Sequence, residues 1–498
     1  MRPSMAKRER DPTQTLERRR AWLIGWALFC CYAYFFYVGG NWNVESHYAQ
    51  TFALAERGSL IIDGYPFLPR GGGDAAFYRG HYYSDKLIGP SLVAAPIYRL
   101  LRETATVSEI SYPWDLYLAF RLTNVATNAL PSALLGALLY LFLAELGLTT
   151  QLRVWLAFTY GLGTLALPYS TALFGHQLAA VAIAGAFMLL WRQRAEWSHR
   201  RAIAAGALAG FAAISDAMGI FVAALLGLYA IWLARDLVGQ ELASCPSSRP
   251  AIAVIASRIA PFALPALAVF SIQLAANWLS FGSPLAFPHL YHAQAAFRAR
   301  HTAGLFGIHL PQLYPLYQLT FGPWRGLFHG SPVLLFALPG FFIMARRWRA
   351  EAILCAASWL VVLLLNSGYE NWTTGSAYGP RYQIVVIPLL IIAAAPLAER
   401  LPLIFKALAA ISIASMAIIT AQTPFIPEGL RSPLSHAIFE FARGNLQNGN
   451  LAMLIPFANL QGFSSLVPLI AVVAAFLLAL RLAKEDASET RGPARRRS

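Results

Sequence analysis

Charged residues are scarce in this sequence. They make up 13% of its 498 residues, whereas a soluble domain carries about 25%. Hydrophobic residues make up 57%, and apolar runs of roughly 17 to 22 residues recur, long enough to cross a ~30 Å hydrocarbon core as helices. Because backbone groups in lipid must be hydrogen-bonded within their own segment, these runs are expected to be α-helices. The scarcity of charge therefore excludes an ordinary soluble domain and predicts an all-α polytopic membrane protein.

Cysteine is also rare. The four cysteines are Cys30, Cys31, Cys245 and Cys355. Two of them fall inside one predicted helix, and none has the spacing of a metal site. Neither a disulfide framework nor a cysteine-based zinc site is expected.

Acidic residues are outnumbered by basic ones, 24 against 39, which gives a net charge of +15. Most of the excess lies in short clusters beside the apolar runs, as the positive-inside rule describes. The basic balance therefore indicates membrane topology, and no nucleic-acid partner is expected. The sequence also has no nucleotide-binding motif and no internal repeat with a clear period.

About twelve transmembrane helices are predicted. They lie near 22–39, 120–144, 153–173, 177–191, 259–280, 331–345, 352–367, 382–397, 402–421 and 465–482, with two more in 202–234. The run 202–234 is too long for one ordinary span and is interrupted by Ser215 and Asp216, so two short helices turning near the aspartate are expected.

The basic clusters predict the orientation. With the N-terminal segment 1–21 in the cytoplasm and the first span uncleaved, the clusters at 192–201, at 346–349 and in the tail 483–498 all fall on the cytoplasmic side. Both termini are then cytoplasmic in a transmembrane domain of residues 22–482, placed in the cell (inner, cytoplasmic) membrane. The outer loops are 40–115, 281–329, 368–381 and 422–464, and the active face is expected to be extracytoplasmic, because functional residues concentrate in loops held by a rigid scaffold.

The first outer loop, 40–115, carries the residues best suited to chemistry. Its acids include Glu45, Asp63, Asp74 and Asp85, and Lys86 precedes an apolar stretch, 87–101, that is too short to span. An interfacial or re-entrant helix is expected there. A lysine at a helix start near the headgroups suits a phosphate, and a nearby carboxylate could accept a proton from a hydroxyl. The alternative is that these charges simply solvate the loop.

A family resemblance rests on several motifs in order along the chain. They are Gly-His-Tyr-Tyr-Ser-Asp-Lys at 80–86, Phe-Gly-Ser-Pro at 281–284, Arg-Gly-Leu-Phe at 325–328 and Gly-Ser-Ala-Tyr-Gly-Pro-Arg-Tyr at 375–382. Together with a basic N-terminus, one span and an acid-bearing loop, this order resembles the membrane-embedded GT-C glycosyltransferases. These use polyprenyl-phosphate sugars, as the protein mannosyltransferases and the aminoarabinose transferases of lipid A do.

The resemblance implies an inverting sugar transfer to an extracytoplasmic lipid, glycan or protein acceptor. An acid of the first loop would activate the acceptor; Glu45 occupies the matching position, while Asp63, Asp74 and Asp85 stay open as alternatives. Lys86 matches the lysine that contacts the donor phosphate, although Lys-Leu-Ile-Gly-Pro replaces the family's Lys-Pro-Pro form.

The later motifs are expected to complete the donor site. Tyr378, Arg381 and Arg325 would face the donor phosphate, Arg381 at the outer mouth of a span where it could fork onto a phosphate. The alternative for the Tyr-Gly-Pro-Arg motif is an interfacial cap on a helix end. No cofactor is expected.

No metal is assigned either, although a divalent cation stays compatible with the loop. His289-x-x-His292 has a spacing that could ligate one, but neither acid nor cysteine accompanies it in the loop 281–329. Asp216 and His176 on the same side are unusual polar residues for their depth, unless the turn reaches the interface and they are solvated.

Two other functions compete with the transferase. Twelve spans suit a transporter or a flippase of lipid-linked sugars, but the two halves of the chain do not match and the polar residues gather at one face. A polymerase or ligase of surface polysaccharide would also use lipid-linked sugars, with its catalytic loop later in the chain. The transferase is the preferred interpretation.

Overall fold

The computed structural model describes residues 12–37, 39–68, 72–104, 114–244, 250–454 and 460–489. These parts of the chain are mostly helical, with two small two-stranded sheets. Seven helices within them are long and apolar enough to cross a membrane: 116–145, 217–241, 251–281, 349–368, 381–400, 402–422 and 462–483. The expectation of an all-α membrane protein is confirmed.

The described residues of the first half of the chain form ten helices and three strands, with short 3₁₀ or π segments labelled η. In order they are α1 (Pro12–Tyr34), β1 (Phe35–Phe36), α2 (Trp42–Arg57), β2 (Ala75–Tyr78), β3 (His81–Ser84), α3 (Gly89–Glu103), α4 (Trp114–Asn124), η1 (Val125–Ala129), α5 (Leu130–Glu145), α6 (Thr150–Leu162), α7 (Ala166–Tyr169), α8 (Gly175–Trp191), η2 (Arg192–Arg194), α9 (His199–Ser215) and α10 (Ala217–Ser244).

The second half follows with ten more helices and one strand in its described residues. They are α11 (Ala251–Phe281), η3 (Pro288–Tyr291), α12 (Ala295–Thr302), α13 (Leu313–Thr320), α14 (Leu327–Gly330), η4 (Pro332–Phe336), α15 (Ala337–Ala345), α16 (Arg349–Gly368), η5 (Arg381–Val386), α17 (Ile387–Arg400), α18 (Pro402–Gln422), α19 (Pro433–Ala442), β4 (Gly449–Asn450), η6 (Leu451–Leu454), η7 (Gly462–Leu466) and α20 (Val467–Glu489).

Helices also occupy the other five predicted spans, as α1, α6, α8, α9 and the segment 332–345. Three predicted boundaries were wrong. The first helix ends at Tyr34, because the chain then pairs as β1 with β4, rather than continuing to residue 39. The helix predicted for 153–173 ends at Leu162, where Gly163 packs against α18. The pair predicted as short helices around Asp216 has 17 and 28 residues.

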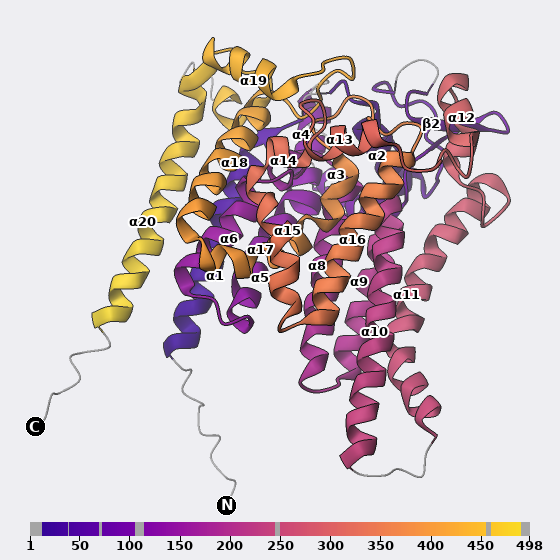
Figure 1. The fold of residues 1–498 in the computed structure, drawn as a ribbon. Helices are drawn as coiled ribbons and strands as arrows, with labels where there is room; N and C mark the ends of the chain where they lie inside the picture. Colours follow the sequence, from indigo (N-terminus) through magenta and orange to yellow (C-terminus); the bar gives the residue numbers. More distant parts are fainter. Residues whose placement is uncertain are drawn as a thin grey trace, which may run out of the picture.

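The helices stand roughly side by side and present two different ends (Figure 1). In Figure 1, α1 begins and α20 ends toward the lower end, while α2, α3, β2, α12 and α19 gather at the upper end. This upper end is called the loop end below. The predicted interfacial helix at 87–101 is present there as α3, which begins at Gly89, three residues after Lys86.

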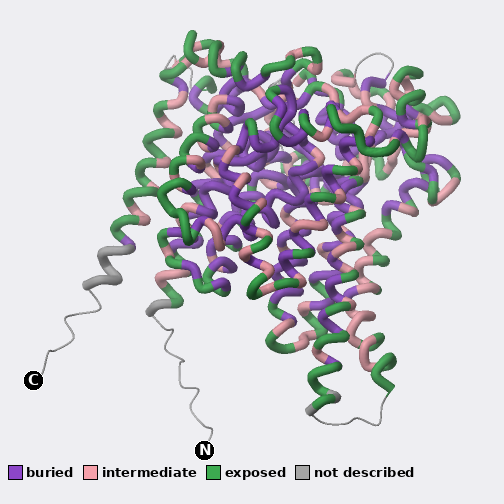
Figure 2. The backbone as a smooth tube through the Cα atoms, in the orientation of Figure 1, coloured by how far each residue is buried: buried purple, intermediate pink, exposed green. Residues whose placement is uncertain are grey.

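Burial follows the pattern expected of a bundle in lipid. Buried residues fill the middle of the molecule, and exposed residues line the outer sides of α11 and α20 (Figure 2). Those exposed positions are largely apolar, for example Leu264 and Leu267 on α11 and Ile470 on α20. Apolar side chains facing outward would be unfavourable in water but are favourable against lipid tails.

Candidate functional site

Glu45 lies in the first turn of α2, at the loop end. Asn41 caps this helix, because its side-chain oxygen accepts a hydrogen bond from the backbone N–H three residues later, at 3.2 Å. The buried Glu45 carboxylate accepts hydrogen bonds from the backbone N–H of Gly40 at 2.8 Å and the hydroxyl of Tyr37 at 3.1 Å. Burial nevertheless raises the pKa of Glu45, and the charge of Asp74 adds to the rise. A carboxylate with a raised pKa is a better proton acceptor near neutral pH.

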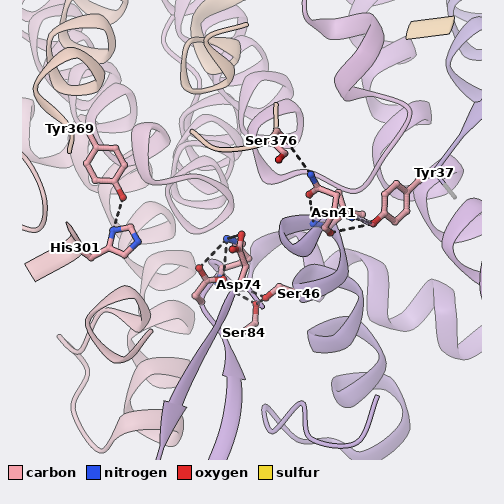
Figure 3. A network of polar contacts seen from close by, with 11 residues as sticks. Tyr37, Asn41, Ser46, Asp74, Ser84, His301, Tyr369 and Ser376 are labelled. Carbon is pink, nitrogen blue, oxygen red and sulfur yellow. Dashed lines mark hydrogen bonds and ion pairs between the residues drawn. The ribbon is translucent and has the colours of Figure 1, made fainter. Parts of the chain in front are cut away.

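The start of α2 is fixed to a distant part of the chain. The side-chain amide of Asn41 donates to the carbonyl oxygen of Ser376 at 3.2 Å, and its backbone N–H donates to the hydroxyl of Tyr37 at 2.6 Å (Figure 3). The loops 40–115 and 368–381, which the sequence analysis assigned to one face, therefore touch each other beside Glu45.

Lys86 joins two acids of the first loop. The β2–β3 hairpin turns at Arg79 and Gly80, both with positive φ, as two-residue hairpin turns require. The turn returns the chain so that the Lys86 ammonium lies 2.9 Å from a carboxylate oxygen of Asp74 and 3.0 Å from one of Asp85. Twelve residues of sequence separate the first pair, so the hairpin is what brings them together.

The ion pair changes the chemistry of both partners. Burial alone would raise the pKa of Asp85, but the Lys86 ammonium lowers it below its ordinary value. Burial alone would lower the pKa of Lys86, but Asp74 and Asp85 raise it. Lys86 thus stays protonated at neutral pH, and Asp85 is a weaker proton acceptor than Glu45.

Three histidines of the loop 281–329 surround this ion pair. His292 pairs with β2, while the rings of His289 and His301 are 4.8 Å apart and those of His292 and His301 are 6.0 Å apart. The Nδ1 atom of His301 is hydrogen-bonded to the hydroxyl of Tyr369 at 2.8 Å (Figure 3). Burial lowers the pKa of His289 and His301 to about 4 and also lowers that of His292. These three imidazoles are therefore neutral at neutral pH.

One group of residues could hold a metal ion. Ligand atoms of Asp74, Asp85 and His292 lie within 4.8 Å of one another. Two carboxylates and an imidazole form a donor set that suits a divalent cation such as Zn²⁺. The Lys86 ammonium lies on both carboxylates, so a metal would compete with it. Of the His289-x-x-His292 pair, only His292 belongs to this group.

Two buried guanidinium groups stand at the loop end, Arg381 near Lys86 and Arg325 near Arg381. The Arg381 guanidinium lies 6.0 Å from the ring centre of Phe174 and 5.8 Å from that of Tyr382, and its Nε is buried without a hydrogen-bond partner in the described chain. Arg325 is 1% exposed. One of its nitrogens donates to the carbonyl oxygen of Gly375 at 2.7 Å, whereas Nε and Nη1 have no partner among the described residues.

Lys86, Arg381 and Arg325 are called the cation cluster below. The charge of Arg381 partly opposes the raised pKa of Lys86 and, after burial, helps to lower the pKa of Arg325 to about 10, so Arg381 is an electrostatic neighbour of both groups. Only Lys86 among them forms an ion pair within the described chain. Two buried positive charges with free N–H groups are unfavourable alone and attract an anion.

Two residues expected in the site have other partners. Asp63 accepts a hydrogen bond from the backbone N–H of Tyr82 at 2.7 Å and pairs with the exposed His81, so it supports the outer side of the hairpin. Tyr378 is buried, and its carbonyl oxygen accepts a hydrogen bond from Tyr169 at 2.8 Å. Its described contacts are with packing residues rather than with Lys86 or Arg381.

Three residues near the site were missed by the sequence analysis: Tyr37, His47 and Tyr369. His47 is buried two residues after Glu45; burial and then the charge of Lys86 lower its pKa to about 3. Tyr369 contacts His301 and experiences the charges of Asp85 and Arg381. A tyrosine at a loop boundary has no distinctive sequence signal, whereas His47 could have been noted from its spacing to Glu45.

A separate cavity of about 380 Å³ lies under α19. Its lining residues are Gln422, Thr423, Ile426, Pro427, Gly429, Leu430, His436, Ala437 and Gln447. None of them carries a carboxylate or a fixed positive charge, so this cavity does not share the chemistry of the cation cluster.

A scan against protein-family models matches none of them to this chain, and a search among curated proteins finds no significant match.

Proposed function

We propose that this protein is a GT-C-type membrane glycosyltransferase that moves a sugar from a polyprenyl-phosphate donor to an acceptor outside the cytoplasm. The observation that carries the proposal is the cation cluster: it holds two buried guanidinium groups with unpaired N–H groups, and one of them, Arg381, lies beside the ion pair of Lys86 with Asp74 and Asp85. Such a group suits the phosphate of a membrane-bound donor. The order of sequence motifs from residue 80 to residue 382 supports the same class.

The proposed topology has twelve spans with both termini in the cytoplasm, in the cell membrane. Seven long apolar helices and five further helices at the predicted positions support this number. The loop end then faces the extracytoplasmic side, at the level of the lipid headgroups. A lipid-linked donor can reach a site at that level without leaving the bilayer.

Glu45 is the proposed base. It is the first-loop acid whose pKa is raised, and its carboxylate is held by Gly40 and Tyr37 rather than by a cation. Asp85 is less suited, because Lys86 stabilises its ionised form. Asp74 shares the same lysine, and Asp63 belongs to the exposed side of the hairpin.

The proposed reaction is a single displacement with inversion. Glu45 takes the proton of the acceptor hydroxyl, whose oxygen forms a bond to the anomeric carbon of the sugar. The bond from that carbon to the phosphate oxygen breaks, and its electron pair leaves with the polyprenyl phosphate. Lys86, Arg381 and Arg325 stabilise the negative charge that develops on this phosphate.

A transporter or flippase of lipid-linked sugars is the second candidate. The observation that favours it is the helix break at Asp216, since transporters use broken helices at binding sites. A cation cluster would bind the phosphate of a transported lipid equally well. The two functions differ in their need for a base, which a flippase does not use.

The decisive experiment measures sugar transfer by purified protein from synthetic polyprenyl-phosphate sugars to a panel of lipid, glycan and peptide acceptors. Glu45→Gln is expected to lower the turnover by roughly 10²–10⁴-fold while donor binding persists, as for the loss of a general base. Lys86→Ala and Arg381→Gln are expected to weaken donor binding instead. Glu103→Gln, a matched control at an exposed ion pair with Arg99, should leave both unchanged.

Two outcomes would reject the proposal. The assignment of the site would be wrong if four single variants all kept full activity: Glu45→Gln, Asp85→Asn, Asp63→Asn and Lys86→Ala. Movement of lipid-linked sugar across proteoliposomes, with no glycosylated product for any acceptor, would identify the flippase instead.

A further inference from the structure

A buried histidine–aspartate pair lies beside the cation cluster and has no role in the reaction described so far. Asp216 separates α9 from α10 in an extended conformation, with φ −151° and ψ 139°. One of its carboxylate oxygens accepts a hydrogen bond from the backbone N–H of Met218 at 2.8 Å, and the other is bonded to Nδ1 of His176, the second residue of α8. Both side chains are buried.

The pair is fixed by close backbone packing. A Cβ atom on Gly175 would lie 2.0 Å from the carbonyl oxygen of Ser215, and one on Gly89 would lie 2.5 Å from the hydroxyl of Ser215. The starts of α3 and α8 therefore press directly on the residue before Asp216. Since α3 begins three residues after Lys86, the same junction fixes the pair and the donor lysine relative to each other.

The imidazole of His176 also borders Arg381. Its ring meets the ring of Tyr382 edge to face, with centres 5.5 Å apart, and stacks on Phe174 at 6.0 Å. Both of these rings flank the Arg381 guanidinium. The charges of Arg381, Lys86 and Asp216 all act on Tyr382, so the pair and two members of the cation cluster lie around one tyrosine.

The hydrogen bond to Asp216 determines what His176 can do. Because Nδ1–H donates to the carboxylate, Nε2 is the nitrogen that gains or loses a proton. Within the described chain Nε2 has no hydrogen-bond partner.

We propose that the His176–Asp216 pair is the acid of the active site, which hydrogen-bonds and protonates the leaving phosphate; this inference rests on the proposed transferase function. As the bond between the anomeric carbon and the phosphate oxygen breaks, the imidazolium Nε2–H gives its proton to a phosphate oxygen. The acceptor proton goes to Glu45, so the reaction neither gains nor loses a proton overall. Asp216 positions His176 and does not itself touch the phosphate.

The test uses farnesyl phosphate, a short polyprenyl monophosphate, and follows its binding to the full-length protein by ³¹P NMR between pH 6 and 8. His176→Gln is expected to weaken binding about tenfold, as for the loss of a charged hydrogen bond to phosphate. Asp216→Asn should act in the same direction. His81→Gln is the matched control, because His81 also pairs with an aspartate but lies at the exposed hairpin.

The pH dependence separates a proton donor from a packing residue. The titratable or charged groups that face the pair are Tyr382 and Arg381 on η5, Tyr169 on α7, Lys86 after β3 and His47 on α2. The pKa of His47 is about 3, so His47 stays neutral between pH 6 and pH 8, and a pH dependence that is lost in His176→Gln belongs to the pair. Wild-type affinity, relative to His176→Gln, should therefore fall as pH rises from 6 to 8.

The outcomes are distinguishable. If wild-type protein does not bind farnesyl phosphate at all, the proposed function fails. If wild type binds it and Arg381→Gln does not, but both His176→Gln and Asp216→Asn bind with wild-type affinity and pH dependence, the donor site stands and the assignment of the acid is overturned. Elution of each variant as a single monodisperse species in detergent checks that it is folded.

Discussion

The ammonium group of Lys86 lies 2.9 Å from a carboxylate oxygen of Asp74, twelve residues earlier in the chain. The β2–β3 hairpin creates this contact, and the neighbouring Asp85 lies at 3.0 Å on the same ammonium group. One lysine therefore compensates two carboxylates, while the two guanidinium groups of the cation cluster form no ion pair in the described chain. The proposed affinity of the site for an anion rests on these two groups.

Replacing Lys86 should convert the acid cluster into a metal site. Lys86→Met removes the ammonium from Asp74 and Asp85 and leaves their two carboxylates, one of them buried, beside His292; the ligand atoms of the three residues lie within 4.8 Å of one another. The variant is expected to bind Zn²⁺ at least tenfold more tightly than wild type, by isothermal titration calorimetry. Adding Asp74→Asn to the variant should abolish the gain in zinc affinity. An unchanged zinc affinity in Lys86→Met would contradict the prediction of a metal site.

Glu45 should make the folded protein less stable as pH rises. Its pKa is raised by burial, so the native state holds the carboxyl proton more tightly than the unfolded chain does. This proton contributes to the free energy of unfolding at low pH. The contribution is lost as pH rises from about 4.3, the pKa in the unfolded chain, through the higher pKa of the native state. Glu45→Gln cannot ionise and avoids this loss. The melting temperature of Glu45→Gln minus that of wild type is therefore expected to increase between pH 4 and pH 7, by differential scanning fluorimetry. A difference that stays constant with pH would contradict the raised pKa.

His47 should make the folded protein less stable as pH falls. Burial and Lys86 lower its pKa to about 3, so the unfolded chain binds a proton before the native protein does, and stability falls as pH drops from about 6.5. Once His47 is protonated in the native protein as well, it has lowered the free energy of unfolding by on the order of 3–5 kcal/mol. His47→Leu should flatten the decline in melting temperature between pH 6.5 and pH 4, whereas the exposed His436→Leu should not.

The packing of α8 on the residue before Asp216 predicts a strong glycine requirement. An alanine at Gly175 would bring Cβ to 2.0 Å from a backbone oxygen that cannot move aside easily. Overpacking of this kind costs about 1–3 kcal/mol, so Gly175→Ala should lower the melting temperature by several degrees. Gly239→Ala on α10 is the control, because its new methyl group meets nothing within 4 Å. It should keep or raise the melting temperature, since alanine favours helix.

The proposed topology predicts opposite labelling of two exposed residues. Ala299 on α12 belongs to the loop end, and Arg200 lies at the start of α9 in a predicted cytoplasmic cluster. In a variant without native cysteines, Ala299→Cys is expected to react with a membrane-impermeant maleimide on intact cells. Arg200→Cys should react only after the membrane is opened. The reverse labelling pattern would show that the loop end faces the cytoplasm, and the proposal of an extracytoplasmic site would then be wrong.

The sequence by itself determined the class of structure. Long apolar runs require helices in lipid, because the bilayer offers no other partner for the backbone, so their positions could be predicted from composition alone. The short stretch after Lys86 could likewise be predicted as a non-spanning helix from its length. Glu45, Lys86 and Arg381 were found because charges are conspicuous in an apolar chain.

The tertiary structure alone decided how those charges are paired. The sequence does not show that Lys86 forms ion pairs with Asp74 and Asp85 while Asp63 pairs with His81. The register of the β2–β3 hairpin sets the distances between these side chains. The contact between His176 and Asp216, forty residues apart, likewise depends on close packing between helix ends that only glycine permits. Residue type can be read along a chain, but burial and partners, which set the charge state of each group, arise only when distant segments pack together.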